Sequence, residues 1–578
     1  MRIPFLFTLI FAWIINLSGQ EITVRIAATS DVHGALFPHD FLNDKPGATS
    51  LASVQAFVDS VRAIPGANLI LLDNGDLIQG TPAAYYANFV QKNRQNLFAR
   101  VLNHIQFDAA TVGNHDIEAG PDVYYRLQRE FNFPWLGGNI LSTNTGKPAF
   151  EPYTIIERDG VKIAVLGMIT PGVPGWLPQT LWPGLEFNAI TGAAEYWVAN
   201  IRQNHQPDAI IGLFHTGMGQ LATDRTNFFP ENAGHQTAVN VRGLDVVILG
   251  HDHRPRAEVV TNVAGHQVQI VNPGSAARNV AYAELKFRAA KDGKFEMMDA
   301  KGKVISLENT PPSTSYVKKF RKDTKAIRKF ANKPVGNLTH SLSAREGLFG
   351  SSAFTDLIHD VQLKITGADI SFTAPLTVNE NLAAGKLLVS DLFKLYRYEN
   401  FLYVMKLTGQ EVKDFLEYSY GLWFNRMSSN NDYLLNYRKD ANGKVVVNSN
   451  GSLSLANPSF NFDSAAGIFY EVDVSKPVGE RVTIFGMENG QLFSENKTYK
   501  VAINSYRGSG GGGHLTTGAG IEHSKLNDRI IYTSEYDIRS MLIGYLGKQK
   551  TISPQPRNNW KVVPEEWWRK GKEKSSLF

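Results

Sequence analysis

Short apolar runs alternate with amphipathic stretches along the first half of the chain. The apolar runs have the length of buried strands and lie at residues 22–29, 68–73, 108–113, 161–170, 208–215, 244–250 and 266–274. Between them, residues 50–64, 96–105 and 193–203 place apolar side chains three or four positions apart, as on one face of a helix. This alternation predicts a layered α/β domain.

The pattern changes near residue 309. A Pro-Pro-Ser-Thr-Ser segment leads into a Lys/Arg-rich amphipathic stretch that ends before Pro334, which predicts a helix linking two domains. A chain of 578 residues is too long for a single core. We therefore expect a first domain over residues 21–310, a linker helix over 311–334 and a second α/β or α+β domain over 335–578.

The N-terminus has the layout of a cleaved secretory signal. One Arg precedes an apolar run over residues 3–15, and small or polar residues follow it up to residue 20. The run is short for a membrane span, although an uncleaved anchor is the alternative. We expect a signal peptide over residues 1–20 and a periplasmic or secreted chain that has no membrane contact after cleavage.

Composition narrows the chemistry. The chain contains no Cys, which excludes disulfides and thiolate metal sites, so any metal must be held by His, Asp, Asn or Glu. The formal charge of +5 is small and is not gathered in a basic arm. A nucleic-acid polymer is therefore an unexpected partner, whereas a small anionic ligand remains open. We expect the chain to act as a monomer.

Five short motifs each follow an expected strand. They are TSDVHG with Asp31 and His33, DNGDLIQG with Asp76, GNHD with Asn114 and His115, FHTG with His215, and GHDH with His251 and His253. A single GNHD is more often a turn and a single GHDH a pair of loop histidines. Ligands of open α/β sheets bind beyond the carboxyl ends of the strands, where loops bring distant residues together. All five motifs in this order favour a site over a set of turns.

These residues suit a two-metal hydrolase. Two cations about 3.5–4 Å apart need a bridging carboxylate, and Asp76 is the natural bridge. Asp31, His33 and His253 would complete one metal site, and Asn114, His215 and His251 the other. Sulfur-free ligands suit Zn, Mn, Fe or Co, and the sequence does not choose among them. Such a pair would clamp a phosphoryl group and lower the pKa of an attacking water.

The motif order resembles the calcineurin-like metallophosphoesterase superfamily. The whole mature chain is similar to the secreted bacterial 5′-nucleotidase / 2′,3′-cyclic-nucleotide phosphodiesterase family. This resemblance implies a four-layer metallophosphoesterase sandwich, a linker helix and a C-terminal α+β substrate-binding domain. It assigns His115 as the residue that is not a ligand but stabilises the transition state and assists the leaving oxygen. The family often has Asp three residues later, where this chain has Glu118, and commonly has Glu where this chain has Asp116.

The resemblance also implies where a nucleotide base would bind. The family sandwiches the base between two aromatic rings, and the matching positions here are Phe462 in SFNFDSAAG and Tyr506 in INSYRGSGGGG. Arg507 is expected in the same substrate site. The alternative is that both rings are core aromatics on strands.

The sub-type of the family bears on the substrate. The NGGGIR-like segment of the 5′-nucleotidase branch is replaced by APL at residues 374–376. LYRYEN at 395–400 and LTGQEVKDFLEYS at 407–419 are more similar to the 2′,3′-cyclic-nucleotide 2′-phosphodiesterase/3′-nucleotidase branch. We expect that activity, used for nucleotide and phosphate salvage, with a 5′-nucleotidase or nucleotide-sugar pyrophosphatase as the alternative. A nucleotide-binding protein without catalysis is a further alternative, and a hinge is expected near residues 325–335.

Overall fold

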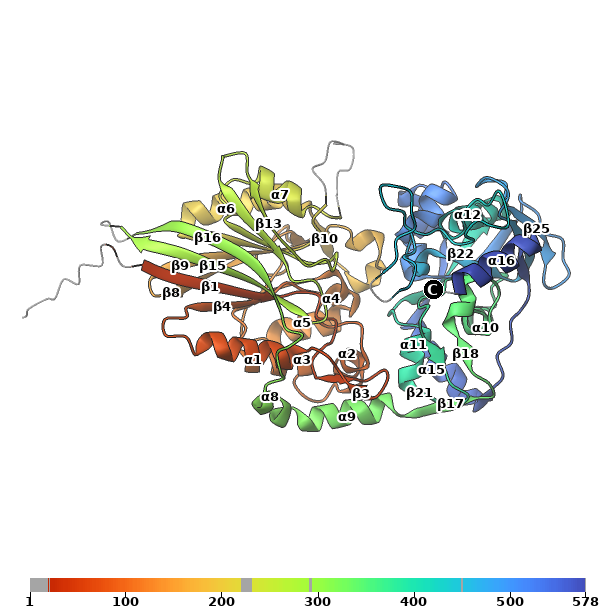
Figure 1. Cartoon of the computed structure of the whole chain (residues 1–578), viewed down its shortest axis with the longest axis horizontal. Coiled ribbons are helices and arrows are strands. Elements are labelled where there is room, and N and C mark those ends of the chain that lie inside the picture. Colours follow the sequence, from red (N-terminus) through yellow and green to blue (C-terminus); the bar gives the residue numbers. More distant parts are fainter. Residues whose placement is uncertain (1–18, 20, 220–230, 291–293, 449–450, 577–578) are drawn as a thin grey trace, which may run out of the picture.

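The protein folds into two bodies that lie side by side and are joined along one edge by α8 (Thr314–Lys319) and α9 (Arg321–Ala331) (Figure 1). The structure, a computed structural model, describes residue 19 and residues 21–219, 231–290, 294–448 and 451–576. Apart from Gly19, the expected signal peptide lies outside the described residues.

The first body is a sandwich of two six-stranded sheets. Along β1, Val24 and Ile26 point between the sheets, whereas Ala27 points outward to the helices, as the two-residue period of a strand requires. Helices cover both outer faces, which confirms the expected four-layer sandwich. The first sheet has the order β16 (Phe295–Ser306), β15 (Asn279–Ala289), β1 (Glu21–Thr29), β4 (Leu69–Asp73), β5 (Ala109–Thr111), β6 (Trp135–Leu136), and the second β13 (Arg256–Thr261), β14 (Gln267–Asn272), β12 (Val246–Leu249), β11 (Ala209–His215), β9 (Val161–Ile169), β8 (Tyr153–Arg158).

The covering helices pack on the sheets through their apolar faces. Val54, Phe98 and Leu127 pack on the first sheet, and Val198 and Ile201 on the second. The strands and helices expected from the hydrophobic pattern are all present. The helices over the first sheet are α1 (Leu51–Arg62), α3 (Leu97–Ile105) and α5 (Pro121–Glu130), and those over the second are α6 (Ile190–Asn204) and α7 (Gly234–Asn240).

Parallel strands bring their carboxyl ends to one edge of each sheet. β1, β4, β5 and β6 run parallel in the first sheet, and β9, β11, β12 and β14 do so in the second. The loops that follow β1, β4, β5, β11 and β12 carry the five motifs, so the topology gathers them on one side of the sandwich.

The linker consists of two short helices rather than one. α8 (Thr314–Lys319) and α9 (Arg321–Ala331) meet at Phe320, whose backbone leaves the helical region. α9 is held on the first domain because Arg100 pairs with Asp323 through two hydrogen bonds of 2.8 Å. Arg328 pairs in the same two-bond manner with Asp44 of a first-domain loop.

The second domain is built on a five-stranded mixed sheet flanked by helices. α12 (Gly409–Trp423) begins with a capping box: Glu411 N donates to the Thr408 hydroxyl, and Thr408 N donates to the Glu411 carboxylate. The sheet has the order β23 (Ser464–Ala466), β19 (Ile370–Thr373), β26 (Thr498–Asn504), β22 (Phe401–Thr408), β27 (Ile530–Asp537), and its main helices are α10 (Ala353–Thr366), α11 (Val389–Leu395), α12 (Gly409–Trp423) and α15 (Ile538–Gln549).

Two small three-stranded sheets and a C-terminal helix complete the second domain. α16 (Glu565–Ser576) is anchored where Trp568 Nε1 donates to the carbonyl of Phe349 over 2.6 Å. The small sheets have the orders β25 (Val482–Met487), β24 (Ile468–Asp473), β29 (Trp560–Val563) and β21 (Gly385–Leu388), β17 (Pro334–Leu338), β28 (Thr551–Ile552). Among the described residues, no helix combines the length and apolar character needed to cross a membrane.

Candidate active site

The five sequence motifs converge at the carboxyl edge of the two sheets. His215 is the last residue of β11, and Asn114 begins the short helix α4 (Asn114–Glu118). His115 follows Asn114 on α4, and the remaining motif residues lie in loops directly after β1, β4 and β12. Asp31, His33, Asp76, His251 and His253 all have positive φ, between 47° and 66°. This conformation is uncommon for residues other than Gly, and its concentration here indicates a backbone shaped for a site.

One group of possible metal ligands comprises Asp31, His33 and His253. Asp31 Oδ1 lies 3.2 Å from His253 Nε2, and the Nε2 atoms of His33 and His253 are 3.1 Å apart. Burial lowers the pKa of His33 to about 4, so its imidazole is neutral and has a lone pair available at neutral pH.

A second group comprises Asp76, His215 and His251. Asp76 Oδ2 lies 3.2 Å from His215 Nε2 and 4.0 Å from His33 Nε2, so this carboxylate reaches toward both groups. Asn114 Oδ1 lies 3.1 Å from His215 Nε2. The donors are imidazole nitrogens and carboxylate or amide oxygens, which fits two divalent cations such as Zn, Mn, Fe or Co.

Electrostatics favour cations at this site. Burial opposes ionisation of Asp31 and Asp76, but the neighbouring imidazoles outweigh it and hold the pKa of both carboxyls below the usual range. Both groups are therefore negative at neutral pH inside a buried site. A buried charge requires an opposite charge nearby. Without metal the His215 imidazole supplies it: burial disfavours its charged form, but the Asp76 carboxylate outweighs burial and raises the pKa of His215 to about 9. Bound cations would take the place of this proton.

Surrounding groups hold the candidate ligands in place. His215 Nδ1 donates to the carbonyl of Asn74 over 2.7 Å, which turns Nε2 toward Asp76 and makes Nε2 the atom that a metal would contact. The Asp116 carboxylate accepts hydrogen bonds from the backbone N–H groups of Asp76, Leu77, Ile78 and Gly113, at 2.8–3.1 Å. Asp116 therefore fixes the loop that carries Asp76 rather than facing the cluster.

His115 lies beside the cluster and is paired with Glu118. Its backbone N–H donates to Asp76 Oδ1 over 2.8 Å, and its Nδ1 makes a short hydrogen bond to Glu118 Oε2. Burial disfavours the charged imidazole, but the carboxylates of Asp76 and Glu118 outweigh it and raise the pKa of His115 to about 10. The longer Glu118 thus reaches the imidazole. With Nδ1 occupied, Nε2 is the atom that can give a proton to a substrate.

Two residues at the cluster carry no recognisable sequence signal. Trp176 stacks on His251 with ring centroids 5.5 Å apart, and Glu231 Oε1 lies 2.9 Å from His251 Nε2. Neither lies in a motif at a strand end. Only the folded chain brings them to the site.

In the second domain, three aromatic rings form a cluster. The ring of Phe460 lies 6.1 Å from that of Tyr398 and 6.4 Å from that of Tyr506, with both pairs edge to face. All three side chains are partly exposed. Tyr506 was expected at such a position from the sequence, whereas Phe460 and Tyr398 were not.

Two of the expected substrate contacts, Phe462 and Arg507, are buried in this structure. Phe462 is 0% exposed and stacks on Trp423 at 5.3 Å, so its faces are closed to a base. Arg507 is 1% exposed. Its guanidinium donates to Asp463 and to the carbonyls of Phe460 and Gly511, at 2.6–2.8 Å. Arg507 therefore shapes the loop that presents Phe460 and Tyr506 instead of contacting a ligand.

The glycine-rich loop is packed against this arginine. Gly512 has φ of 71°, and a Cβ atom there would come within 2.0 Å of Arg507 Nη1. Only glycine fits this position, so the loop has a fixed conformation and is not a flexible linker.

The aromatic cluster of the second domain faces the first domain. Burial raises the pKa of Tyr398, and the carboxylate of Glu118 in the first domain raises it further. Burial also raises the pKa of Tyr506, on which Glu231 of the first domain acts in the same direction. The aromatic cluster and the metal-ligand cluster are therefore within electrostatic reach of each other.

Comparison with known families agrees with the division of the chain into two domains. The family described as "Calcineurin-like phosphoesterase" matches residues 24–255, and that described as "5′-nucleotidase, C-terminal domain" matches residues 334–518. The first match covers most of the first domain, and the second covers the second domain up to residue 518.

Curated relatives match nearly the whole chain. The trifunctional nucleotide phosphoesterase protein YfkN of Bacillus subtilis is 28% identical over 95% of this chain, which spans only 39% of that protein's length. The 2′,3′-cyclic-nucleotide 2′-phosphodiesterase/3′-nucleotidase of Salmonella typhimurium is 25% identical over 95% of this chain and 90% of its own.

Solved structures show the same fold. A Staphylococcus aureus protein assigned to the 5′-nucleotidases has a TM-score of 0.75 at 20% identity, covering 93% of this chain and 99% of the other. A 5′-nucleotidase precursor from Thermus thermophilus has a TM-score of 0.62 at 19% identity, covering 94% and 100%. The chain is thus similar to metal-dependent phosphoric ester hydrolases, with a calcineurin-like phosphoesterase match over residues 24–255 and a 5′-nucleotidase C-terminal match over residues 334–518.

Proposed function

We propose that the protein hydrolyses nucleotides, with 2′,3′-cyclic and 3′-nucleotides as the preferred substrates, after export to the periplasm or the outside. The observation that carries this proposal is a cluster of His, Asp and Asn side chains that could hold metal ions, facing an aromatic cluster of the second domain. The phosphate of a nucleotide would bind at the candidate metal ligands, and its base would stack on the aromatic cluster. Seven residues are proposed as metal ligands: Asp31, His33, Asp76, Asn114, His215, His251 and His253.

The side chains at the site have separate tasks in this reaction. When bound, two divalent cations supply Lewis-acid stabilisation of the phosphoryl group and lower the pKa of an attacking water. His115 Nε2 donates a proton to the leaving oxygen, and its raised pKa keeps it protonated at neutral pH. Glu118 holds the ring in the orientation that presents Nε2.

The base is received by Tyr398, Phe460 and Tyr506. Stacking on an aromatic face contributes about 1–3 kcal/mol per base and tolerates any base. Because Tyr398 is followed by buried Glu399, which pairs with Arg539 over 3.1 Å, the ring stands on a fixed part of the second domain.

Phe460 and Phe462 should respond differently to replacement by Ala. Phe460→Ala should raise KM about tenfold, because a stacking face is lost while the core is kept. Phe462→Ala should lower the free energy of unfolding by about 3–5 kcal/mol, because it leaves a cavity beside Trp423. Steady-state kinetics and denaturant unfolding of both variants check this. Equal KM values for Phe460→Ala and the parent protein would contradict the assignment.

A substrate panel tests the proposed activity. The metal-reconstituted protein is given 2′,3′-cyclic AMP, 3′-AMP and 5′-AMP, and kcat/KM is measured for each. Higher values for the first two support the proposal. A preference for 5′-AMP would favour the 5′-nucleotidase or nucleotide-sugar pyrophosphatase alternative, and binding of all three without turnover would favour a non-catalytic binder.

Substrate that touches both clusters has to enter between the domains, so we propose that the domains open and close. Since Arg100, Asp44 and their partners bind α9 to the first domain, the bend should lie after Asn332 rather than throughout residues 325–335. The contact between Tyr85 and Ser540 marks the closed arrangement.

Cross-linking the domains should suppress turnover. The chain has no Cys, so Tyr85→Cys and Ser540→Cys can be joined specifically by a short bismaleimide. Loss of opening should lower kcat by on the order of tenfold or more, because substrate entry and product release need it. The same double variant without cross-linker is the control, and unchanged kinetics in a fully cross-linked sample would refute the motion.

A further inference from the structure

A polar cavity of about 650 Å³ lies between the two domains. Arg254 of the first domain lines one side, and residues 436–439 and 454–456 of the second line the other. None of the described residues that line it is acidic. A cavity of this size can hold a nucleotide-sized ligand.

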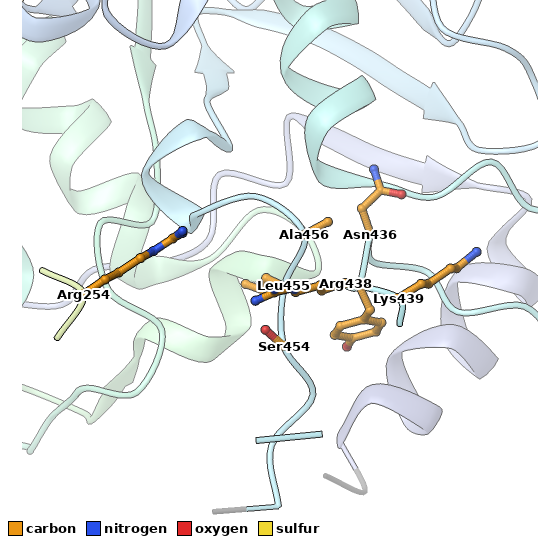
Figure 2. A pocket seen from close by; sticks show the side chains of 8 residues that line it. Arg254, Asn436, Arg438, Lys439, Ser454, Leu455 and Ala456 are labelled. Carbon is orange, nitrogen blue, oxygen red and sulfur yellow. The ribbon is translucent and has the colours of Figure 1, made fainter. Parts of the chain in front are cut away.

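Two arginines approach this space from opposite domains. Figure 2 shows the side chains of Arg254 and Arg438 extending toward one another, with the hydroxyl of Ser454 beside Arg438. Lys439 also lines the cavity, but its amino group points away from Arg254. Among the described residues, neither guanidinium has a hydrogen bond or an ion pair with another side chain, whereas Arg328, Arg507 and Arg539 each pair with a carboxylate.

Asn436 and Tyr437 of the cavity wall are less available to a ligand. The Asn436 amide donates to the carbonyls of Gly421, Leu422 and Phe424, and Tyr437 is largely buried. The strand-like segment that carries Arg438 is fixed, because Arg438 N donates to the carbonyl of Ser454 over 2.7 Å and Ser454 N donates to that of Val446 over 3.0 Å. Among the described residues that line the cavity, the two guanidiniums are thus the unpaired cations that extend toward one another across it.

We propose that Arg254 and Arg438 bind a phosphate group between the domains, separate from the one held at the metal site. Guanidinium groups offer paired N–H donors that match the oxygens of phosphate. Two facing cations without carboxylates repel each other, and a bound dianion removes this repulsion. Since the arginines come from different domains, the anion also holds the cleft closed.

The position of the cavity favours a phosphate carried by the substrate. Arg254 directly follows His253, so the cavity begins one residue from the proposed metal ligands. This inference rests on the proposed function: with one phosphate at the metals and the base on the aromatic cluster, a second phosphate of the same nucleotide would reach the arginines. Free inorganic phosphate has the same chemistry and is the other source to be distinguished.

The test compares 3′-AMP with adenosine 3′,5′-bisphosphate, which differ only in the second phosphate. For Arg438→Ala at low ionic strength, the ratio of kcat/KM for the bisphosphate to that for 3′-AMP should fall about tenfold, because a charge-assisted contact is lost. Lys439→Ala removes the same charge from the same wall and should leave this ratio unchanged. Thermal unfolding verifies that both variants fold.

Calorimetric titration of the metal-loaded protein with inorganic phosphate provides a readout without turnover. If the substrate ratio is constant but phosphate affinity falls about tenfold in Arg438→Ala and not in Lys439→Ala, the site takes free phosphate. If neither quantity changes, the arginine site is overturned, whereas continued hydrolysis of 3′-AMP would leave the proposed function standing.

Discussion

Replacing His115 by Ala is expected to lower kcat by about 10²–10⁴-fold while the metal content stays at that of the parent protein. The leaving oxygen then has no proton donor, whereas Asp76 should keep its position, because its hydrogen bond from residue 115 comes from the backbone N–H, which Ala retains. Stopped assays on protein of measured metal content give both numbers. Loss of metal together with activity, or retention of full activity, would contradict the role of His115.

Glu118→Gln should act through the pKa of His115. The Glu118 carboxylate is one of the groups that raise it, so its neutralisation should lower it. A general acid must be protonated, and activity is lost as pH rises through its pKa. The alkaline loss of kcat should therefore move to lower pH in Glu118→Gln. An unshifted pH profile would mean that Glu118 does not govern the imidazole.

Asp76→Asn is expected to reduce bound metal below two ions per chain and to lower turnover by about 10³-fold or more. Asp76 Oδ2 reaches toward His215 and His33, one from each ligand group, so loss of its charge should weaken both metal sites. The amide keeps the volume and an acceptor for His115 N–H. Elemental analysis after dialysis measures the metal.

A control variant distinguishes the loss of a metal ligand from the loss of one negative charge. Asp122 is an exposed carboxylate on α5 outside the cluster, and Asp122→Asn removes the same charge. It should retain both metals and full turnover. Two tightly bound metals and normal kinetics in Asp76→Asn would rule out Asp76 as the bridging ligand.

Most strands and candidate ligands of the first domain could be predicted from the sequence, because each is marked by a short local pattern. Each apolar run is one strand, and Asp31, Asp76 and His215 come directly after strands whose carboxyl ends share an edge. What the sequence could not supply was the positive φ at five site residues, or the approach of Trp176 and Glu231 to His251, since these depend on the folding of distant loops.

The second domain shows where sequence reasoning failed. Phe460 and Phe462 are two positions apart and would share a face on a strand, but a single 3₁₀ turn over Ser459–Asn461 separates them. The Phe462 ring enters the core beside Trp423, and the Phe460 ring joins the aromatic cluster. Arg507 was misassigned for a similar reason: its partners Asp463 and the carbonyl of Phe460 are more than forty positions away. The sequence of the Gly-rich segment does not indicate these partners of Arg507.

A metal titration with a nucleotide substrate tests the central claim most directly. Protein stripped of metal by a chelator is supplied with increasing Mn²⁺ or Zn²⁺, and hydrolysis of 2′,3′-cyclic AMP is measured against bound metal. Activity absent at the start and rising to a plateau at two ions per chain is the result predicted for a dinuclear nucleotide phosphoesterase. Undiminished activity in the stripped protein, or no hydrolysis with two ions bound, would contradict it.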